Sequence, residues 1–97
     1  MIAIRWSPQA ADDLESIRAF IARDSVHYAS LVVQRLVAAI DLLASSPRMG
    51  RVVPELADQD VREVIVGAYR IVYRCRHDSV EIATIFHGAQ RLPANDP

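Results

Sequence analysis

Three arginines in one alternating segment are the residues of this chain best suited to bind an anion. Arg70, Arg74 and Arg76 fall at even positions between apolar residues. A β-strand places alternate side chains on one face, so we expect the three guanidinium groups to line one side of a sheet. A guanidinium binds carboxylate or phosphate through two parallel hydrogen bonds. The pattern predicts a surface for an anion or a partner. The alternative is a solvated face on which Glu63 and Glu81 of adjacent strands neutralise the charge.

A histidine near the end of the chain is the other candidate for chemistry. His87 follows the last apolar run, and Arg91 comes four residues later. A histidine can act as a general acid or base near neutral pH, although a lone histidine at a strand end more often only makes a hydrogen bond. His27 and His77 are not spaced as metal ligands with it. The sequence therefore predicts no metal site and no cofactor.

Size and composition exclude several classes of protein. The chain has 97 residues and a formal net charge of -1, which predicts one small domain without a strong global field for nucleic acid. All eleven basic residues are arginine, so no lysine can form a Schiff base. The single cysteine, Cys75, excludes an internal disulfide. With no long apolar run and no signal peptide, we expect a cytoplasmic protein that binds no membrane.

The first half of the chain predicts one short strand and two helices. Residues 2–6 alternate as a strand, and Ser7 can cap a helix over 8–23. Ser25 can cap a second helix over 26–44. Because so few residues join the two helices, they should form an antiparallel hairpin.

The second helix has more apolar surface than one neighbour can bury. Leu31, Ala38 and Leu42 form a second apolar stripe beside the main one. The first helix and the sheet could cover it, or a partner chain could.

The second half of the chain predicts a long connection and then a meander of strands. Residues 45–60 contain Pro47, Gly50 and Pro54 and show no period. The strands are expected at 61–66, 69–76 and 80–86. Short hairpin connections make neighbouring strands antiparallel.

Together these elements predict an α+β fold in the order βααβββ. The helical hairpin should pack on one face of a small, mostly antiparallel sheet. No element is left for the other face, so we expect that face to be bare, with the arginines on it. Residues 1–91 should form a single domain, followed by a tail at 92–97.

Four stretches in this order resemble the ParE/RelE superfamily of type II toxin–antitoxin toxins. They are Trp6-Ser-Pro-Gln-Ala-Ala-Asp-Asp-Leu14, Ser46-Pro-Arg-Met-Gly-Arg-Val-Val-Pro-Glu55, Tyr69-Arg-Ile-Val-Tyr-Arg74, and Ile82 to Arg91 with its His-x-x-x-Arg end. The resemblance covers nearly the whole chain. No single motif is strict, and it is their order and spacing that resemble the family.

The resemblance implies one of two activities. RelE-like members are ribosome-dependent mRNA endonucleases, whereas ParE-like members poison DNA gyrase, trap cleaved DNA and stop replication. This chain lacks the lysine of many RelE-like enzymes and has no tyrosine after Tyr73. Its near-neutral charge also suits an RNA-rich ribosomal site poorly. The resemblance therefore implies a ParE-like toxin of a plasmid-stabilisation module. An mRNA endonuclease is the first alternative, and a non-toxic binding paralogue is the second.

The resemblance also assigns roles to residues. A gyrase poison needs no catalytic residue and no sequence-specific contact with nucleic acid, and its target-binding candidates are Arg70, Arg74, Arg76, His87 and Arg91. If the chain were a nuclease, the catalytic candidates would be Glu55, Arg62, Arg70 and His87. A ParD-like antitoxin should neutralise the toxin, and its candidate contacts are Leu31, Arg35, Ala38 and Leu42.

Overall fold

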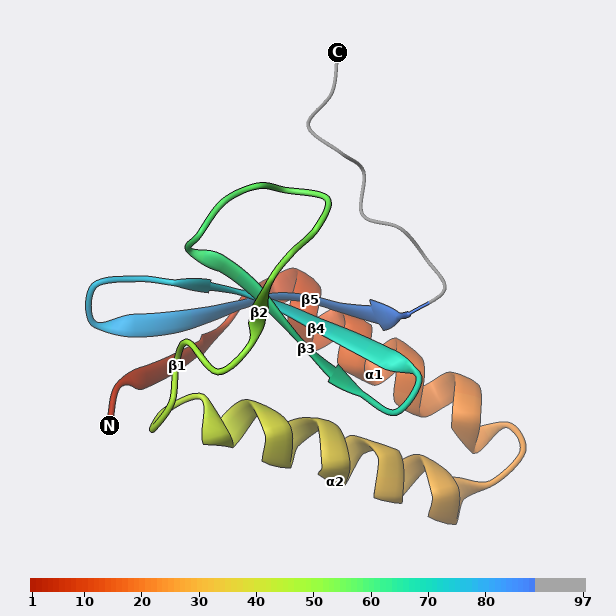
Figure 1. Ribbon diagram of the computed structural model, residues 1–97. Helices are drawn as coiled ribbons and strands as arrows, with labels where there is room; N and C mark the ends of the chain where they lie inside the picture. Colours follow the sequence, from red (N-terminus) through yellow and green to blue (C-terminus); the bar gives the residue numbers. More distant parts are fainter. Residues whose placement is uncertain (89–97) are drawn as a thin grey trace.

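Two helices lie on one face of a five-stranded sheet in the computed structural model, which describes residues 1–88 (Figure 1). The elements are β1 (Ala3–Trp6), α1 (Pro8–Ala22), α2 (Val26–Leu42), β2 (Arg51–Val52), β3 (Val61–Val66), β4 (Tyr69–Cys75) and β5 (Ser79–His87). The α+β prediction and the helical hairpin on one face are confirmed. Neither helix is long and apolar enough to cross a membrane.

The strands follow the order β1-β5-β4-β3-β2 across the sheet. The predicted antiparallel meander of β3, β4 and β5 is present, and β1 pairs with β5 in parallel. Strand β2 was not predicted. It has only two residues, Arg51 and Val52, which pair with Glu63 and Arg62 of β3. A pair this short has no detectable period, so only the neighbouring strand defines it.

Both helices begin at the predicted serine caps. The hydroxyl oxygen of Ser7 accepts a hydrogen bond from the Ala10 amide, and that of Ser25 accepts one from the Tyr28 amide, each at 3.0 Å. The helices end at Ala22 and Leu42, earlier than expected.

Ser7 and Asp13, near the start of the chain, stabilise a bulge in β5. The register shifts by one residue after Val72, because Val72 faces Thr84 while the next residue of β4 faces Ile82. The Ser7 hydroxyl donates to the carbonyl of the skipped residue, Ala83, at 2.8 Å. The Asp13 carboxylate accepts from the Thr84 hydroxyl at 2.6 Å and from the next backbone amide at 2.9 Å. These contacts satisfy backbone groups that a bulge leaves unpaired.

The main core lies between the helices and the sheet. Its fully buried members include Leu36, Ile40, Leu43, Ile71, Tyr73 and Ile82. Ile71 and Tyr73, which alternate with the arginines along β4, face the helices. Cys75 packs on the same cluster but is only half-buried, and its thiol donates to the Pro47 carbonyl at 3.4 Å.

The prediction of a bare outer face is wrong. Val53, Val61 and Val72 form a second buried cluster there, and Leu56 and Phe86 pack against it. In Figure 1 the segment between α2 and β3 rises over the side of the sheet opposite the helices. Its apolar residues have no regular spacing, so periodicity could not show that this connection forms a third layer.

Candidate functional site

Arg70 lies at the centre of a buried group of charges on the outer face. Its side chain donates to Glu63 at 2.6 Å and makes a two-bonded contact with Glu55 at 2.9 and 3.0 Å. The residue is only 7% exposed, and the Glu63 side chain is fully buried. Arg51 donates to the other Glu63 oxygen at 2.6 Å. Arg70, Glu63 and Glu55 thus form a largely buried group of charges, and Arg51 binds Glu63 from an exposed position on β2.

The surroundings of Arg70 keep it charged and fixed. Its hydrogen bonds to Glu55, together with those to Glu63, raise the pKa of the guanidinium against the opposing effect of burial. The guanidinium carbon lies 5.0 Å from the centre of the Phe86 ring, a distance suited to a cation–π contact. Because buried ion pairs are costly to break, the cluster fastens the segment that carries Glu55 to β4.

Arg74 and Arg76 occupy more exposed positions. Arg74 binds Asp58 at 3.4 Å, and Arg76 binds Glu81 at 3.1 Å. The Asp60 amide, with a smaller contribution from Arg74, lowers the pKa of the Asp58 carboxyl. The three arginines therefore do not form one open row. The segment between α2 and β3, here called the covering segment, buries Arg70. Acidic side chains bind Arg74 and Arg76. Glu63 and Glu81 are ion-pair partners as expected, of Arg70 and Arg76.

The Pro-x-x-Gly stretch, from Pro47 to Gly50, anchors the start of the covering segment. The Gly50 amide donates to the Tyr73 hydroxyl at 3.0 Å. A Cβ atom at residue 50 would lie 2.6 Å from both the Glu63 carbonyl oxygen and that hydroxyl, so only glycine fits. Arg62 donates to the carbonyls of Gly50 and Gln59 at 3.1 Å. It thereby ties the two ends of the segment together.

The candidate nuclease residues are divided between the two faces of the sheet. Glu55 and Arg70 bind each other on the outer face, where the Arg70 guanidinium also lies over the Phe86 ring. Arg62 alternates with the outward residue Glu63, so it lies on the helix side, where it donates to the backbone. His87 ends β5 and packs edge-on against the Tyr69 ring, with 5.8 Å between ring centres.

The candidate antitoxin residues lie on an accessible part of α2. Arg35 and Ala38 are exposed, Leu42 is 58% exposed and Leu31 is half-buried. Neither α1 nor the sheet buries this stripe, in agreement with an unpartnered helix face. Arg91 lies outside the described residues. No group of metal-binding side chains occurs within residues 1–88.

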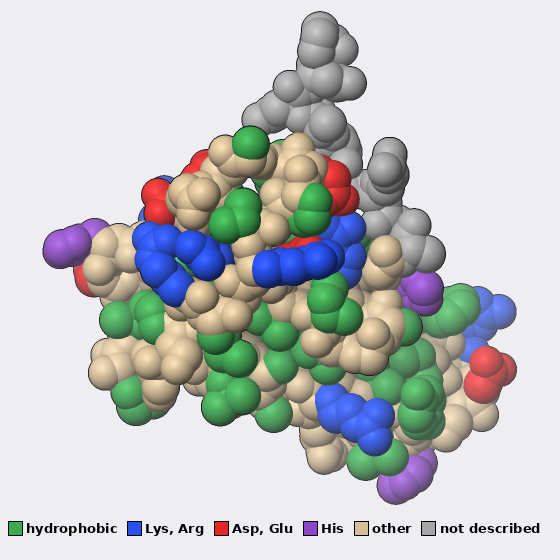
Figure 2. Space-filling view, viewed as in Figure 1, with side chains coloured by type: hydrophobic (Ala, Val, Ile, Leu, Met, Phe, Trp, Pro, Cys, Tyr) green, Lys and Arg blue, Asp and Glu red, His purple; other side chains and the backbone are tan. Residues whose placement is uncertain are grey.

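Several residues of this site were missed from the sequence. Arg51 was not a candidate, yet it binds the buried Glu63 from an exposed position, and Arg48 binds Asp60 at 2.9 Å. Tyr73 was not a candidate either, although its hydroxyl accepts a hydrogen bond from the backbone of the connection. The glycine of the Pro-x-x-Gly stretch was the one available signal. Figure 2 shows basic and acidic side chains gathered where this connection crosses the sheet, and mainly apolar ones below, toward α2.

Comparison with known proteins identifies the family. The model for "ParE toxin of type II toxin-antitoxin system, parDE" matches residues 4–92. The chain belongs to this family. Its sequence is 38% identical over 92 residues to "Putative toxin Y4kP" of Sinorhizobium fredii, covering 93% of this chain and 92% of that protein. It is 36% identical over 91 residues to "Toxin RelE2" of Caulobacter vibrioides, covering 93% and 99%.

Two solved structures have the same fold as this ParE-family chain. One is described as the chromosomal ParDE system of P. aeruginosa, with a TM-score of 0.74 and 21% identity over 90% of this chain and 96% of that one. The other is the RelBE2 toxin–antitoxin complex of Mycobacterium tuberculosis, with a TM-score of 0.60 and 22% identity over 92% and 93%. The family expected from the four sequence stretches is confirmed. The chain is a toxin of the ParE/RelE type from a type II toxin–antitoxin system.

Proposed function

We propose that this toxin acts on DNA gyrase, stabilises the cleaved state of the DNA and so blocks replication, and that a ParD-like antitoxin neutralises it in the cytoplasm. The observation that carries the proposal is the state of Glu55. A general base must reach the proton that it removes. Here both carboxylate oxygens of Glu55 accept hydrogen bonds from Arg70, at 2.9 and 3.0 Å.

The position of Arg62 supports the same proposal. A nuclease that activates a 2′-hydroxyl needs its base and its cationic groups around one phosphate. Arg62 and Arg70 lie on opposite faces of the sheet, so their guanidinium groups do not surround one point. This arrangement favours a protein that acts through binding.

The target-binding proposal rests on the accessible members of the predicted set. Arg74 and Arg76 are paired only at the surface, where an ion pair contributes roughly 0–1 kcal/mol and can be exchanged for a partner's carboxylate. His87 is exposed at the end of β5. We assign the contact with gyrase to these three residues together with Arg91. Arg70 acts indirectly, because it positions the segment that also carries Asp58.

The second candidate function is ribosome-dependent mRNA cleavage. It is favoured by one observation, the 36% identity to a protein named "Toxin RelE2". The same candidate residues, Glu55, Arg62, Arg70 and His87, would then have to rearrange on the ribosome.

A pair of purified assays distinguishes these functions. The toxin is added to gyrase, ATP and supercoiled plasmid, and in parallel to a reconstituted translation reaction. Gyrase poisoning predicts linear plasmid after denaturation with detergent and protease, and intact mRNA. Cut mRNA with no linear plasmid would overturn the gyrase proposal in favour of the endonuclease.

Expression of the toxin alone in bacteria tests for the non-toxic paralogue. Filamentous cells with damaged DNA are expected. Normal growth with soluble toxin present would contradict both toxic functions. Co-expression with the antitoxin encoded beside the toxin gene should restore division, and failure to do so would contradict the antitoxin proposal.

A further inference from the structure

A groove lies between α1 and the end of β5. Its volume is about 640 Å³, within the range of about 300–1,000 Å³ that is typical of ligand sites. Ser16, Phe20 and His87 line the groove and are exposed, so it is open to solvent. A small molecule is usually buried over most of its surface, and this open groove therefore suits a protein segment better.

Aromatic rings form much of the wall of this groove, from Phe20, Tyr69, Phe86 and His87. Two of the rings already bind a guanidinium. The guanidinium carbon of Arg23 lies 5.7 Å from the centre of the Phe20 ring, and Arg70 lies over the Phe86 ring at 5.0 Å. Phe20 is nevertheless 66% exposed, so it has room for a further group. The wall is therefore suited to a cation that can also make apolar contact.

The groove carries a negative charge at Asp13. Within residues 1–88 no basic side chain forms an ion pair with this carboxylate. It accepts three hydrogen bonds from neutral donors, which are the Gln9 amide, the Thr84 hydroxyl and the Ile85 backbone amide. A carboxylate has about four acceptor positions, so roughly one remains. Asp12, the neighbouring residue, is exposed and adds a second negative charge to this end of α1.

Strand β5 adds a backbone acceptor to the same groove. Strand β1 pairs with β5 only as far as Ile82, and no other strand of residues 1–88 continues along that edge. The Ile85 amide points to this edge, because it donates to Asp13. The amide and the carbonyl of one strand residue point to the same side, so the Ile85 carbonyl faces the edge as well. The Ser16 hydroxyl can also accept, and the groove thus presents acceptors for a donor-rich cation.

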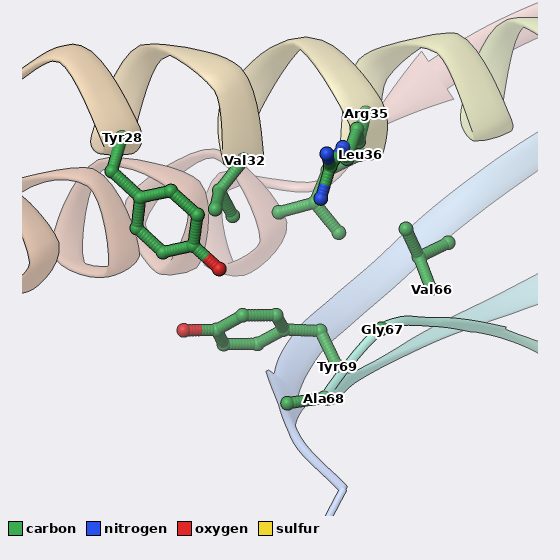
Figure 3. A pocket seen from close by; sticks show the side chains of 8 residues that line it. All are labelled: Tyr28, Val32, Arg35, Leu36, Val66, Gly67, Ala68 and Tyr69. Carbon is green, nitrogen blue, oxygen red and sulfur yellow. The ribbon is translucent and has the colours of Figure 1, made fainter.

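A second, smaller pocket separates this groove from the residues expected to bind the antitoxin. Its volume is about 110 Å³, and Figure 3 shows Tyr28 and Val32 extending from α2 toward Tyr69 at its floor. Arg35, an antitoxin candidate, lines this smaller pocket. The α1 groove contains no antitoxin candidate and does contain His87, a candidate for target binding. This position favours the target as the occupant of the groove.

We propose that the groove between α1 and β5 binds an arginine side chain of gyrase. The guanidinium donates to the Asp13 carboxylate and the Ile85 carbonyl, and its flat surface and aliphatic stem pack on the aromatic wall. Arginine fits better than lysine, because its planar group stacks on rings and presents five donors in a fixed geometry. DNA is a poor occupant, because Asp12 and Asp13 repel phosphate. The inference rests on the proposed function, since it names the chemistry by which the toxin recognises its target.

An arginine residue alone is the smallest probe of this site. Amide chemical shifts of the full-length toxin are followed by NMR during titration with N-acetyl-arginine methylamide. We expect saturable shifts at Ser16, Phe20 and Ile85. N-acetyl-citrulline methylamide replaces the guanidinium with a neutral urea group and should shift these amides far less. Equal shifts with the two probes, or no shift with either, would overturn the proposal.

Charge substitution at Ser16 tests the groove against gyrase itself. Ser16→Arg should raise the dissociation constant for gyrase by about tenfold or more, because it places a cation in the groove, and Ser16→Glu should lower it by about twofold or more. The matched control is Ala11→Arg, at a position exposed on α1 and outside the groove, which should change it by less than about twofold. Equal effects of the two arginine substitutions would remove the groove from the interface.

The same assay separates this inference from the proposed function. Wild-type toxin that poisons gyrase while Ser16→Arg binds it equally well would overturn the groove and leave the function intact. Wild-type toxin that neither binds nor poisons gyrase would overturn the function and the gyrase assignment together, and the arginine titration would then report on the groove alone.

Binding to the antitoxin encoded beside the toxin gene shows that the variants are folded. Ser16→Arg should keep wild-type affinity for it. Phe20→Ala, which removes an exposed ring, is the second variant and should raise the dissociation constant for gyrase by about fivefold or more. Loss of antitoxin affinity in both variants, with unchanged circular dichroism, would assign the groove to the antitoxin and overturn the proposal. A free toxin that sediments as a dimer and is dissociated by Ser16→Arg would assign it to a second copy, with the same consequence.

Discussion

The Gly50 amide and the Tyr73 hydroxyl are joined by a buried hydrogen bond of 3.0 Å across 23 positions of sequence. The bond fixes the point where the chain leaves the helical layer and starts across the outer face. The residues of this connection that cover that face, including Glu55, come after this point in the chain. Several substitutions can test how strongly the covering segment is held.

Tyr73→Phe should destabilise the fold by about 1–3 kcal/mol, because the buried Gly50 amide loses its acceptor. Tyr28→Phe is the control, since that tyrosine is exposed. Urea unfolding at pH 8 measures both. Equal stability of Tyr73→Phe and the wild type would mean that water replaces the hydroxyl and that the bond does not fix the segment.

The same tyrosine should make the wild type sensitive to alkali. Burial raises the pKa of Tyr73, so the folded state favours the neutral phenol. This stabilisation is fully present below the unfolded pKa of about 10 and is lost as the pH rises from there through the folded pKa. The free energy of unfolding should therefore fall as the pH rises above about 10 in the wild type and fall less in Tyr73→Phe. Parallel curves for the two proteins would contradict this role.

Gly50→Ala should destabilise the fold by about 1–3 kcal/mol through overpacking, because the added methyl group meets two oxygen atoms at 2.6 Å. Met49→Ala, at the exposed neighbouring position, should cost less than about 0.5 kcal/mol. Thermal unfolding compares the two variants. A fully stable Gly50→Ala would show that the covering segment can shift at little cost.

The two glutamates of the predicted cross-strand pairs should differ sharply in their effect. Glu63→Gln removes one of the two carboxylates that neutralise the buried Arg70 and should cost about 2–4 kcal/mol. Glu81→Gln removes a surface partner of Arg76 and should cost less than about 1 kcal/mol. Denaturant unfolding measures both. Similar small values would mean that the buried cluster contributes little to holding the segment.

Substitutions on the exposed stripe of α2 test the antitoxin contact. Leu31→Asp and Leu42→Asp should each weaken antitoxin binding by about tenfold or more, because they place a charge in an apolar interface. They should lower the solubility of the free toxin far less. Phe20→Asp on α1 is the control, as a large exposed apolar residue away from the stripe. Calorimetric titration with the antitoxin gives the affinities, and unchanged values for both stripe variants would exclude the stripe from the interface.

Local patterns were enough to predict the elements and the side of the sheet on which the helices pack. Ser7 and Ser25 mark helix starts by chemistry that needs only the next three residues. The alternation from Tyr69 to Cys75 assigned each side chain of β4 to a face, because a strand has a period of two. The extra strand β2 and the ends of the helices were not predicted correctly, because tertiary contacts decide where strand pairing and helix hydrogen bonding stop.

Only the folded chain decided that Arg70 is buried. Its partner Glu55 is 15 positions earlier, in a connection whose apolar residues follow no period. The path of that connection depends on contacts such as that between Gly50 and Tyr73. These contacts join segments that are distant in sequence, so the local spacing of residues does not reveal them. Sequence periodicity reports which face a side chain occupies, whereas what covers that face is set by the packing of segments far apart along the chain.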